Sequence, residues 1–235
     1  MFSSSISLLL LLAAVLLSAG LSSAEAPSSG PRRLACAGDG NTINGYPAIL
    51  QSMLGDDWTV DVYATGAATI LDGTLRPYRR TDEYRSLLAS SPDVVIIMLG
   101  TNDARHQYWD GLEERDTDFV GKPSQEFRQG YYDLITELRE LDSTPEIMVA
   151  TPPPINPGGL AVDGRWAMAR MRDNLNDGVI PLIREVAAEA EGVKLVDVHG
   201  HMSASGGVVD LMDDGVHYSS AGYKKMCEVF EAALM

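Results

Sequence analysis

Apolar residues are grouped in short runs that alternate with helix-like patterns along most of the chain. The strongest run is "DVVIIMLG", residues 93–100, in which six consecutive apolar residues stand between Asp93 and Gly100. A run of this length that is rich in Val and Ile predicts a strand that is buried on both faces. Shorter runs predict further strands at residues 34–37, 58–63, 147–150 and 193–198.

The segments between these runs carry the spacing of amphipathic helices. In residues 124–141 the apolar positions recur every three or four residues, at Phe127, Tyr131, Leu134, Leu138 and Leu141. Residues 165–190 show the same pattern, although Pro181 is expected to kink or split that helix. Further helices are predicted at residues 45–54, 81–89 and 220–235. The alternation predicts an α/β fold, a three-layer α/β/α sandwich around a five-stranded parallel sheet of flavodoxin-like type.

Polar and glycine-rich blocks follow the predicted strands. They are "GDGNT" at residues 38–42, "TGAAT" at 65–69 and "GTND" at 100–103, and "DGVH" at 214–217 precedes the last helix. Each block alone is weak, because Gly-Asp-Gly is usually only a turn. In an open α/β sheet, however, ligands bind beyond the carboxyl ends of the strands, so the four blocks are expected to meet at one edge.

These blocks resemble those of the SGNH or GDSL hydrolases. More narrowly, they are similar to the carbohydrate acetylesterase branch that includes sialate O-acetylesterase-like proteins. The resemblance runs from about Leu34 to the C-terminus and rests on "GDGNTINGYPAILQSMLG", "SPDVVIIMLGTNDAR" and "DGVHYSSAGY". It implies the SGNH hydrolase fold and an esterase-type site for acylated, above all O-acetylated, carbohydrate esters.

The resemblance also implies roles for individual residues. His217 corresponds to the general base, and Asp214, three residues earlier, orients its ring. Asn102 corresponds to the side-chain donor of the oxyanion hole. A main-chain N–H after the second strand is the other donor: Gly66 supplies it, or Ala67 if Thr69 anchors the match. The supporting residues implied by the same motifs are Asp39, Gly100 and Asp103.

The nucleophile of the family is missing, because Gly40 stands where the serine is expected. Glycine suits the turn but cannot form an acyl-enzyme. One hypothesis is a divergent member that binds an acylated glycan and has lost efficient serine-dependent hydrolysis. A second is an active hydrolase that uses another nucleophile, or a water activated by His217 in the room left at Gly40. A third is a non-catalytic secreted binding module.

Several other residues are candidates for the surroundings of the site. His106, Tyr108 and Trp109 are expected to overhang it as a substrate rim, or to pack under a loop. The proline-rich segment 151–159 is expected to form a stiff rim at the same edge. Ser219 and Ser220 are expected to cap the last helix.

Metal and cofactor chemistry is not expected from the sequence. His199 and His201 lack cysteine or acidic partners at ligand spacing, so no metal site is predicted. No cofactor is predicted. Cys36 and Cys227 form either a disulfide, which a secreted protein would permit, or two buried free thiols.

The N-terminus and the net charge bear on location and partners. The apolar run within residues 1–24 predicts a secretory signal peptide, followed by a flexible lead-in at 25–33 and one SGNH hydrolase-type domain at 34–235. We therefore expect a protein that is secreted or held in an endomembrane lumen, with no membrane association after cleavage. A net charge of −15 argues against nucleic-acid binding. The expected partner is a small acyl ester or an acylated glycan, and the oligomeric state is left open.

Overall fold

The five predicted strands form one parallel sheet. The computed structural model describes residues 30–43, 45–111, 122–159, 162–206, 210 and 214–235. The strands are β1 (Arg32–Gly38), β2 (Trp58–Ala64), β3 (Val94–Met98), β4 (Glu146–Ala150) and β5 (Val193–Val196), in the order β2-β1-β3-β4-β5. This order confirms the predicted flavodoxin-like arrangement. Strand β1 begins at Arg32, two residues before the predicted start of the domain.

Alternate residues of the central strands point to opposite faces of the sheet, as period-two geometry requires. In β1, Leu34 and Cys36 pack on one face, and Ala35 and Ala37 pack on the other. Strand β3 behaves in the same way, and all five of its residues are buried. Because both faces are covered, the strands read as continuous apolar runs.

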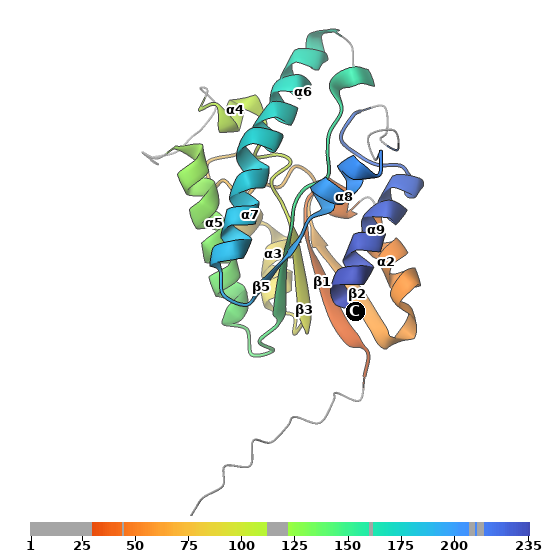
Figure 1. Ribbon diagram of the computed structural model, residues 1–235. Helices are drawn as coiled ribbons and strands as arrows, with labels where there is room; N and C mark the ends of the chain where they lie inside the picture. The colour runs from red at the N-terminus through yellow and green to blue at the C-terminus, as the bar shows by residue number, and fades with distance from the viewer. Residues whose placement is uncertain (1–29, 44, 112–121, 160–161, 207–209, 211–213) are drawn as a thin grey trace, which may run out of the picture.

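Helices cover the two faces and make the three layers (Figure 1). One layer contains α2 (Tyr46–Leu54), α8 (Val198–Ala204) and α9 (Ser220–Leu234). The other contains α3 (Asp82–Leu88), α5 (Pro123–Arg139) and α7 (Ile180–Glu189). The shorter elements are α1 (Gly40–Ile43), α4 (His106–Trp109) and the 3₁₀ turns η1 (Gly55–Asp57), η2 (Tyr78–Arg80) and η3 (Pro157–Gly159). Helix α8 was not predicted, whereas Ser219 caps α9 as expected, accepting a hydrogen bond from the Gly222 N–H at 3.3 Å.

The long helical pattern at residues 165–190 forms two α-helices joined by a π-helical segment. Helix α6 (Val162–Asn174) leads into η4 (Leu175–Val179), and α7 follows directly. Pro181 lies in the first turn of α7. The wider π turn accommodates the proline, which has no N–H to donate. Pro181 was predicted to kink or split the helix; the structure has a π turn just before it, within a continuous helical run, and α6 lies above the sheet edge (Figure 1).

Two further expectations concern the ends of the chain and its cysteines. The predicted signal peptide and most of the lead-in lie outside the described residues, so secretion stays a prediction. Across the part of the chain that the structure describes, no helix combines the length and the apolar character needed to cross a membrane. Cys36 and Cys227 are both buried and free, which fits the second of the two alternatives.

Candidate active site

The four sequence blocks meet around one cavity of about 870 Å³ at the carboxyl-terminal edge of the sheet. This volume lies within the range typical of small-molecule sites. The predicted site residues that line the cavity are Asp39, Gly40, Gly66, Ala67, Asn102, Asp214 and His217. The convergence expected from the strand-end rule is therefore present.

The first block forms a tight turn that is organised by Asp39. Its side-chain Oδ1 accepts a hydrogen bond from the Asn41 N–H at 3.0 Å. Its carbonyl oxygen accepts from the N–H groups of Thr42 and Ile43, each at 3.1 Å. Burial raises the pKa of the Asp39 carboxyl to about 6, although these contacts oppose the rise. Asp39 thus shapes the turn that presents Gly40 to the cavity.

The second block forms a turn that brings Gly66 and Ala67 to the cavity. Residues 65–68 form a turn in which the Ala68 N–H donates to the Thr65 carbonyl oxygen at 3.3 Å. Ala67 occupies the third position of this turn with φ of 62°. Glycine is normally preferred in this left-handed conformation, because a Cβ atom is strained there. Ala67 therefore takes the conformational place of a glycine, and both it and Gly66 line the cavity.

Asn102 reaches the cavity but is held by protein acceptors. Its Nδ2 donates to Asp39 Oδ2 and to the Ala68 carbonyl oxygen, both at 3.2 Å. Both contacts are long for hydrogen bonds of this type. The amide thus ties the first two blocks together, and it would have to share a hydrogen with a ligand oxygen to act as an oxyanion donor.

Gly100 and Asp103 support the third block from behind. Asp103 is fully buried, and its Oδ1 accepts from the Leu71 N–H at 2.8 Å. Burial raises the pKa of its carboxyl to about 7. Gly100 has φ of 125°, and a Cβ atom there would meet Val179 at 2.8 Å. These two residues hold the loop rather than face the cavity.

Asp214 and His217 form a hydrogen-bonded pair, as the resemblance implied. The ring Nδ1 of His217 lies 2.6 Å from Asp214 Oδ2. The other carboxylate oxygen accepts from the N–H groups of Val216 and His217, both at 3.0 Å. Burial alone would raise the pKa of Asp214, but these hydrogen bonds outweigh burial and lower it. An ionised Asp214 holds the proton on Nδ1 and leaves Nε2 as the basic nitrogen.

The proline-rich segment braces the loop that carries this pair. The Asn156 N–H donates to the Gly215 carbonyl oxygen at 2.8 Å, and the Tyr218 hydroxyl donates to the Pro154 carbonyl oxygen at 2.5 Å. Gly215 has φ of 74°, and a Cβ atom there would lie 2.1 Å from the Asn156 carbonyl oxygen. The segment was predicted to be a stiff rim, and its contacts to Gly215 and Tyr218 hold the loop on which His217 lies.

The space beside Gly40 is filled by the His217 ring. A Cβ atom built on Gly40 would lie 2.6 Å from Nε2, with ring carbons at 3.5 and 3.7 Å. Such a separation is shorter than real Cβ contacts, so a side chain at residue 40 requires the ring to move. The expectation that a water stands beside Gly40 for His217 to activate stays a prediction. A water activated by Nε2 has to approach from the cavity.

Within the described part of the chain, no obvious substitute for the serine lies in the cavity. Among the described residues, Thr101 is the single hydroxyl-bearing residue in its lining. Thr101 is 2% exposed, and its side chain is hydrogen-bonded to the Asp39 carboxyl. Cys36 lies inside β1, where burial raises the pKa of its thiol to about 12, so it does not form a reactive thiolate.

The predicted aromatic rim is only partly correct. His106 lines the cavity, but Tyr108 is 6% exposed and belongs to the core. Trp109 packs edge-on against Phe127, with ring centroids 5.6 Å apart. In the four-residue helix α4, one face points to the cavity and the other to the core, so the three residues cannot all overhang the site.

Sequence reasoning missed the wall that α6 contributes. Ala167, Met168 and Met171 line the cavity on that side. Trp166 is 64% exposed and packs edge-on against the ring of His106, with centroids 5.1 Å apart. No local motif marks these residues; the only signal was the exposed tryptophan in a helical pattern. The wall adds to the apolar surface that Ile43, Leu75 and Val216 contribute to the cavity.

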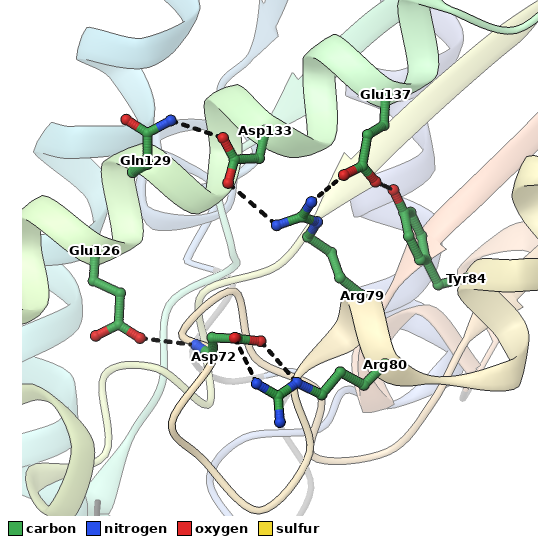
Figure 2. Close-up of polar contacts among 8 residues, drawn as sticks. All are labelled: Asp72, Arg79, Arg80, Tyr84, Glu126, Gln129, Asp133 and Glu137. Atoms are coloured by element: carbon green, nitrogen blue, oxygen red, sulfur yellow. Dashed lines mark hydrogen bonds and ion pairs between the residues drawn. The ribbon is translucent and has the colours of Figure 1, made fainter. Parts of the chain in front are cut away.

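A polar cluster fixes the loop between β2 and α3 to helix α5 (Figure 2). Arg79 bonds to Glu137 and, at 3.2 Å, to Asp133. Tyr84 donates its hydroxyl to the same Glu137 carboxylate. Further along, the Asp72 N–H donates to Glu126 Oε1 at 2.9 Å. The loop that begins with Gly66 is thus anchored at its far end.

The two histidines after β5 serve separate contacts. His199 Nδ1 lies 3.1 Å from the Pro152 carbonyl oxygen, and His201 Nε2 lies 3.6 Å from Glu228. Within the residues that the structure describes, no group of three or more His, Cys, Asp or Glu side chains is placed to hold a metal ion.

Comparison with known proteins places this chain in a family. The model of the GDSL-like lipase/acylhydrolase family matches residues 22–225. An acetylxylan esterase of Xylanibacter ruminicola is 32% identical over 241 residues, covering 91% of this chain and 45% of the relative. A multidomain esterase of Ruminococcus flavefaciens is 29% identical over 139 residues, covering 58% of this chain and 15% of the relative.

The chain spans less than half the length of these two curated relatives. Among solved structures, an acetyl xylan esterase from Geobacillus stearothermophilus has a TM-score of 0.63 at 20% identity, covering 86% of this chain and 94% of that one. At this identity the likeness concerns the fold alone. The family match and the Xylanibacter relative go further: the chain belongs to the GDSL-like lipase/acylhydrolase family, within the SGNH hydrolase superfamily.

Proposed function

We propose that the cavity binds O-acylated carbohydrate esters and that efficient serine-dependent hydrolysis has been lost. The first half is supported by the relatives, which are named as an acetylxylan esterase and a multidomain esterase. It is also supported by the open cavity of about 870 Å³, since a vestigial site would be filled by side chains. The second half rests on Gly40, which has no side chain to acylate.

One observation carries the proposal: His217 Nε2 occupies the room that a nucleophilic side chain at residue 40 would need. An esterase of this type requires both a serine oxygen and a base beside it. Here the base stands in the place of the nucleophile. The absence of a serine side chain is therefore accompanied by a second difference: the His217 ring lies in the space that the side chain would need.

The retained Asp214–His217 pair favours a slow second activity. The pair is joined at 2.6 Å and its Nε2 faces the cavity. A general base of this kind can activate a water that enters from the cavity side. Sites stripped of one triad member retain about 10³–10⁴-fold acceleration over the uncatalysed reaction. Hydrolysis at that level is measurable and lies far below ordinary esterase rates.

Acetate release and binding, measured together, test the proposal. The purified chain is incubated with acetylated xylo-oligosaccharides, and the same ligands are titrated calorimetrically. We expect binding of the ligands, with turnover well below the ordinary enzyme range of about 1–10³ s⁻¹. A His217→Ala variant should lose the residual turnover while it still folds. Turnover at ordinary esterase rates that His217→Ala abolishes would overturn the loss of hydrolysis, and absence of binding would overturn the ligand class.

A further inference from the structure

Two arginines line the cavity of a chain that carries a net charge of −15. Arg76 lies on the loop after β2, and Arg105 lies between β3 and α4. Acidic residues far outnumber basic ones in this chain, so a cation without a carboxylate beside it is unexpected.

Most arginines of the described residues are paired with carboxylates. The arginines in such ion pairs are Arg32, Arg79, Arg80, Arg85, Arg128, Arg170, Arg172 and Arg184. Arg105 is half-buried and, within the described part of the chain, forms no ion pair. Asp110, the carboxylate that follows α4, is occupied by Arg170 through two 2.9 Å hydrogen bonds. Arg105 lines the cavity, and no carboxylate of the described residues pairs with its guanidinium.

The backbone fixes where the Arg105 side chain begins. Its N–H donates to the Asn102 carbonyl oxygen at 3.2 Å. Its own carbonyl oxygen accepts from the N–H groups of Tyr108 and Trp109, each at 2.9 Å. The side chain therefore starts from a held position, three residues after Asn102. A guanidinium whose backbone is held by hydrogen bonds loses less conformational entropy when it binds a ligand than one on a loose loop.

Arg76 supplies a second cation that is tied to the oxyanion loop. Its Nη1 donates to the Gly66 carbonyl oxygen at 3.0 Å. A neutral carbonyl does not compensate the charge, and the guanidinium has further N–H groups to offer. The two carboxylates of the lining are committed elsewhere, Asp39 to its own turn and Asp214 to His217.

We propose that Arg105, assisted by Arg76, binds a carboxylate on the acylated sugar, so that the ligand is an acidic glycan such as one bearing a uronic or sialic acid. The planar guanidinium fork matches a carboxylate with two parallel hydrogen bonds. The cavity of about 870 Å³ has room for an acidic sugar beside the acylated one. Arg105 is then a specificity-determining residue. This assignment rests on the proposed function, because it assumes that an acylated sugar occupies the cavity.

Calorimetric titration with three matched probes tests the assignment. The probes are neutral acetylated xylo-oligosaccharides, the same oligosaccharides carrying a glucuronic acid branch, and O-acetylated sialic acid. We expect at least one acidic probe to bind roughly tenfold or more tightly than the neutral probe, and this preference should shrink as salt is raised. Whichever acidic probe binds more tightly identifies the source of the carboxylate.

Variants of Arg105 separate its role from general charge effects. Arg105→Gln should lower the ratio of acidic-probe to neutral-probe affinity about tenfold or more. Arg105→Lys should fall between the two, because lysine keeps the charge but not the fork. Arg33→Gln, at the start of β1 and away from the cavity, is the control with the same change in net charge.

The outcomes distinguish this assignment from the proposed function. Equal binding of neutral and acidic probes, or a preference that Arg105→Gln leaves intact, would overturn the role of Arg105 while the binding of acylated sugars stands. Failure of all three probes to bind the folded chain would overturn the proposed function itself. Unchanged thermal unfolding of Arg105→Gln shows that the variant is folded, as expected for a side chain without an ion-pair partner.

Discussion

His217 Nε2 lies 2.6 Å from the position that a Cβ atom would take at Gly40. The position where the resemblance expects a serine and the histidine proposed as the base are therefore in direct contact. The ring cannot simply swing away, because its Nδ1 is held by Asp214 at 2.6 Å. Any side chain at residue 40 has to displace the far end of an imidazole that is tethered at its other nitrogen.

Restoring the serine should restore part of the lost chemistry. In Gly40→Ser, the hydroxyl gains His217 as its base, and Gly66 and Ala67 line the same cavity. We expect acetate release from acetylated xylo-oligosaccharides to rise about tenfold or more over the natural chain. The gain should stop short of ordinary esterase rates, since the ring must shift to admit the new side chain and Asn102 is bound to Asp39.

Gly40→Ala is the matched control for this gain, because it adds the same Cβ atom without the oxygen. It should show no gain in acetate release and a loss of stability of about 1 kcal/mol from crowding. If Gly40→Ala releases acetate as fast as Gly40→Ser, the added oxygen is not the nucleophile and the assignment of residue 40 fails.

A side chain at Gly215 is expected to be strongly destabilising, because backbone strain and a steric clash would act together there. Its φ of 74° is strained for other residues, and a Cβ atom would lie 2.1 Å from a backbone oxygen of Asn156. Gly215→Ala should therefore lower the free energy of unfolding by about 3 kcal/mol or more. It should also weaken ligand binding, since the Asp214–His217 loop must move. Urea unfolding and calorimetric titration measure the two effects.

Gly206→Ala separates the two costs. Gly206 has a similar φ of 70°, but a Cβ atom there would meet nothing within 4 Å. Its substitution should cost only about 1 kcal/mol, the price of the backbone strain alone. Equal losses in both variants would mean that the Asn156 contact does not constrain the loop.

Much of the fold was predictable, because its signals are local. The strand at 93–100 and the helix at 124–141 are read from periods of about two and 3.6 residues, which depend only on neighbours. The strand-end rule predicts that Gly40, Asn102 and His217 meet at one edge, and all three line the cavity there. The resemblance to SGNH hydrolases added the roles of individual residues, and the site geometry agrees with the Asp214–His217 pairing.

The errors arose where non-local packing decides. Tyr108 and Trp109 were placed on the rim, but the register of α4 turns them into the core. Ala67 adopts a left-handed conformation that its residue type does not announce. The α6 wall depends on tertiary packing, because α6 contacts residues far away in the sequence. Its Arg170, for example, bonds to Asp110, which is 60 residues earlier in the chain. The position of the His217 ring against Gly40 is likewise a tertiary property.

The buried Asp103 carboxyl should make the stability of the fold depend on pH. Its pKa is raised by burial from 3.8 to about 7. The folded state therefore binds more protons than the unfolded state between these values, so its contribution to stability is present at low pH and falls as the pH rises through about 7. Asp103→Asn keeps an acceptor for the Leu71 N–H but carries no charge. Relative to this variant, the natural chain should lose on the order of 2–4 kcal/mol between pH 4 and pH 8.

Urea unfolding at several pH values measures this difference. Asp56→Asn removes a carboxyl from the exposed η1 turn and controls for the change in net charge. Its curve should follow that of the natural chain. If the free energy of unfolding has the same pH dependence in Asp103→Asn and in the natural chain from pH 4 to 8, the pKa of Asp103 is not raised by folding.

The Arg79 anchor should matter more than the neighbouring Arg80 pair. Arg79 is about one-third exposed and joins two carboxylates of α5, whereas Arg80 is 66% exposed and pairs with Asp72 on its own loop (Figure 2). Arg79→Met leaves Asp133 and Glu137 facing each other without a cation, so we expect a loss of about 1–2 kcal/mol in the free energy of unfolding. Arg80→Met should cost no more than about 0.5 kcal/mol, as is usual for exposed pairs.

The same anchor should also influence ligand binding, because the loop it holds begins with Gly66 and Ala67. If the anchor fixes these residues, Arg79→Met should weaken calorimetric binding of acetylated xylo-oligosaccharides several-fold, and Arg80→Met should not. A charge effect alone would act equally in both variants, since each removes one guanidinium from the same loop. Equal weakening would therefore refute the anchor, and unchanged binding with reduced stability would confine its role to the fold.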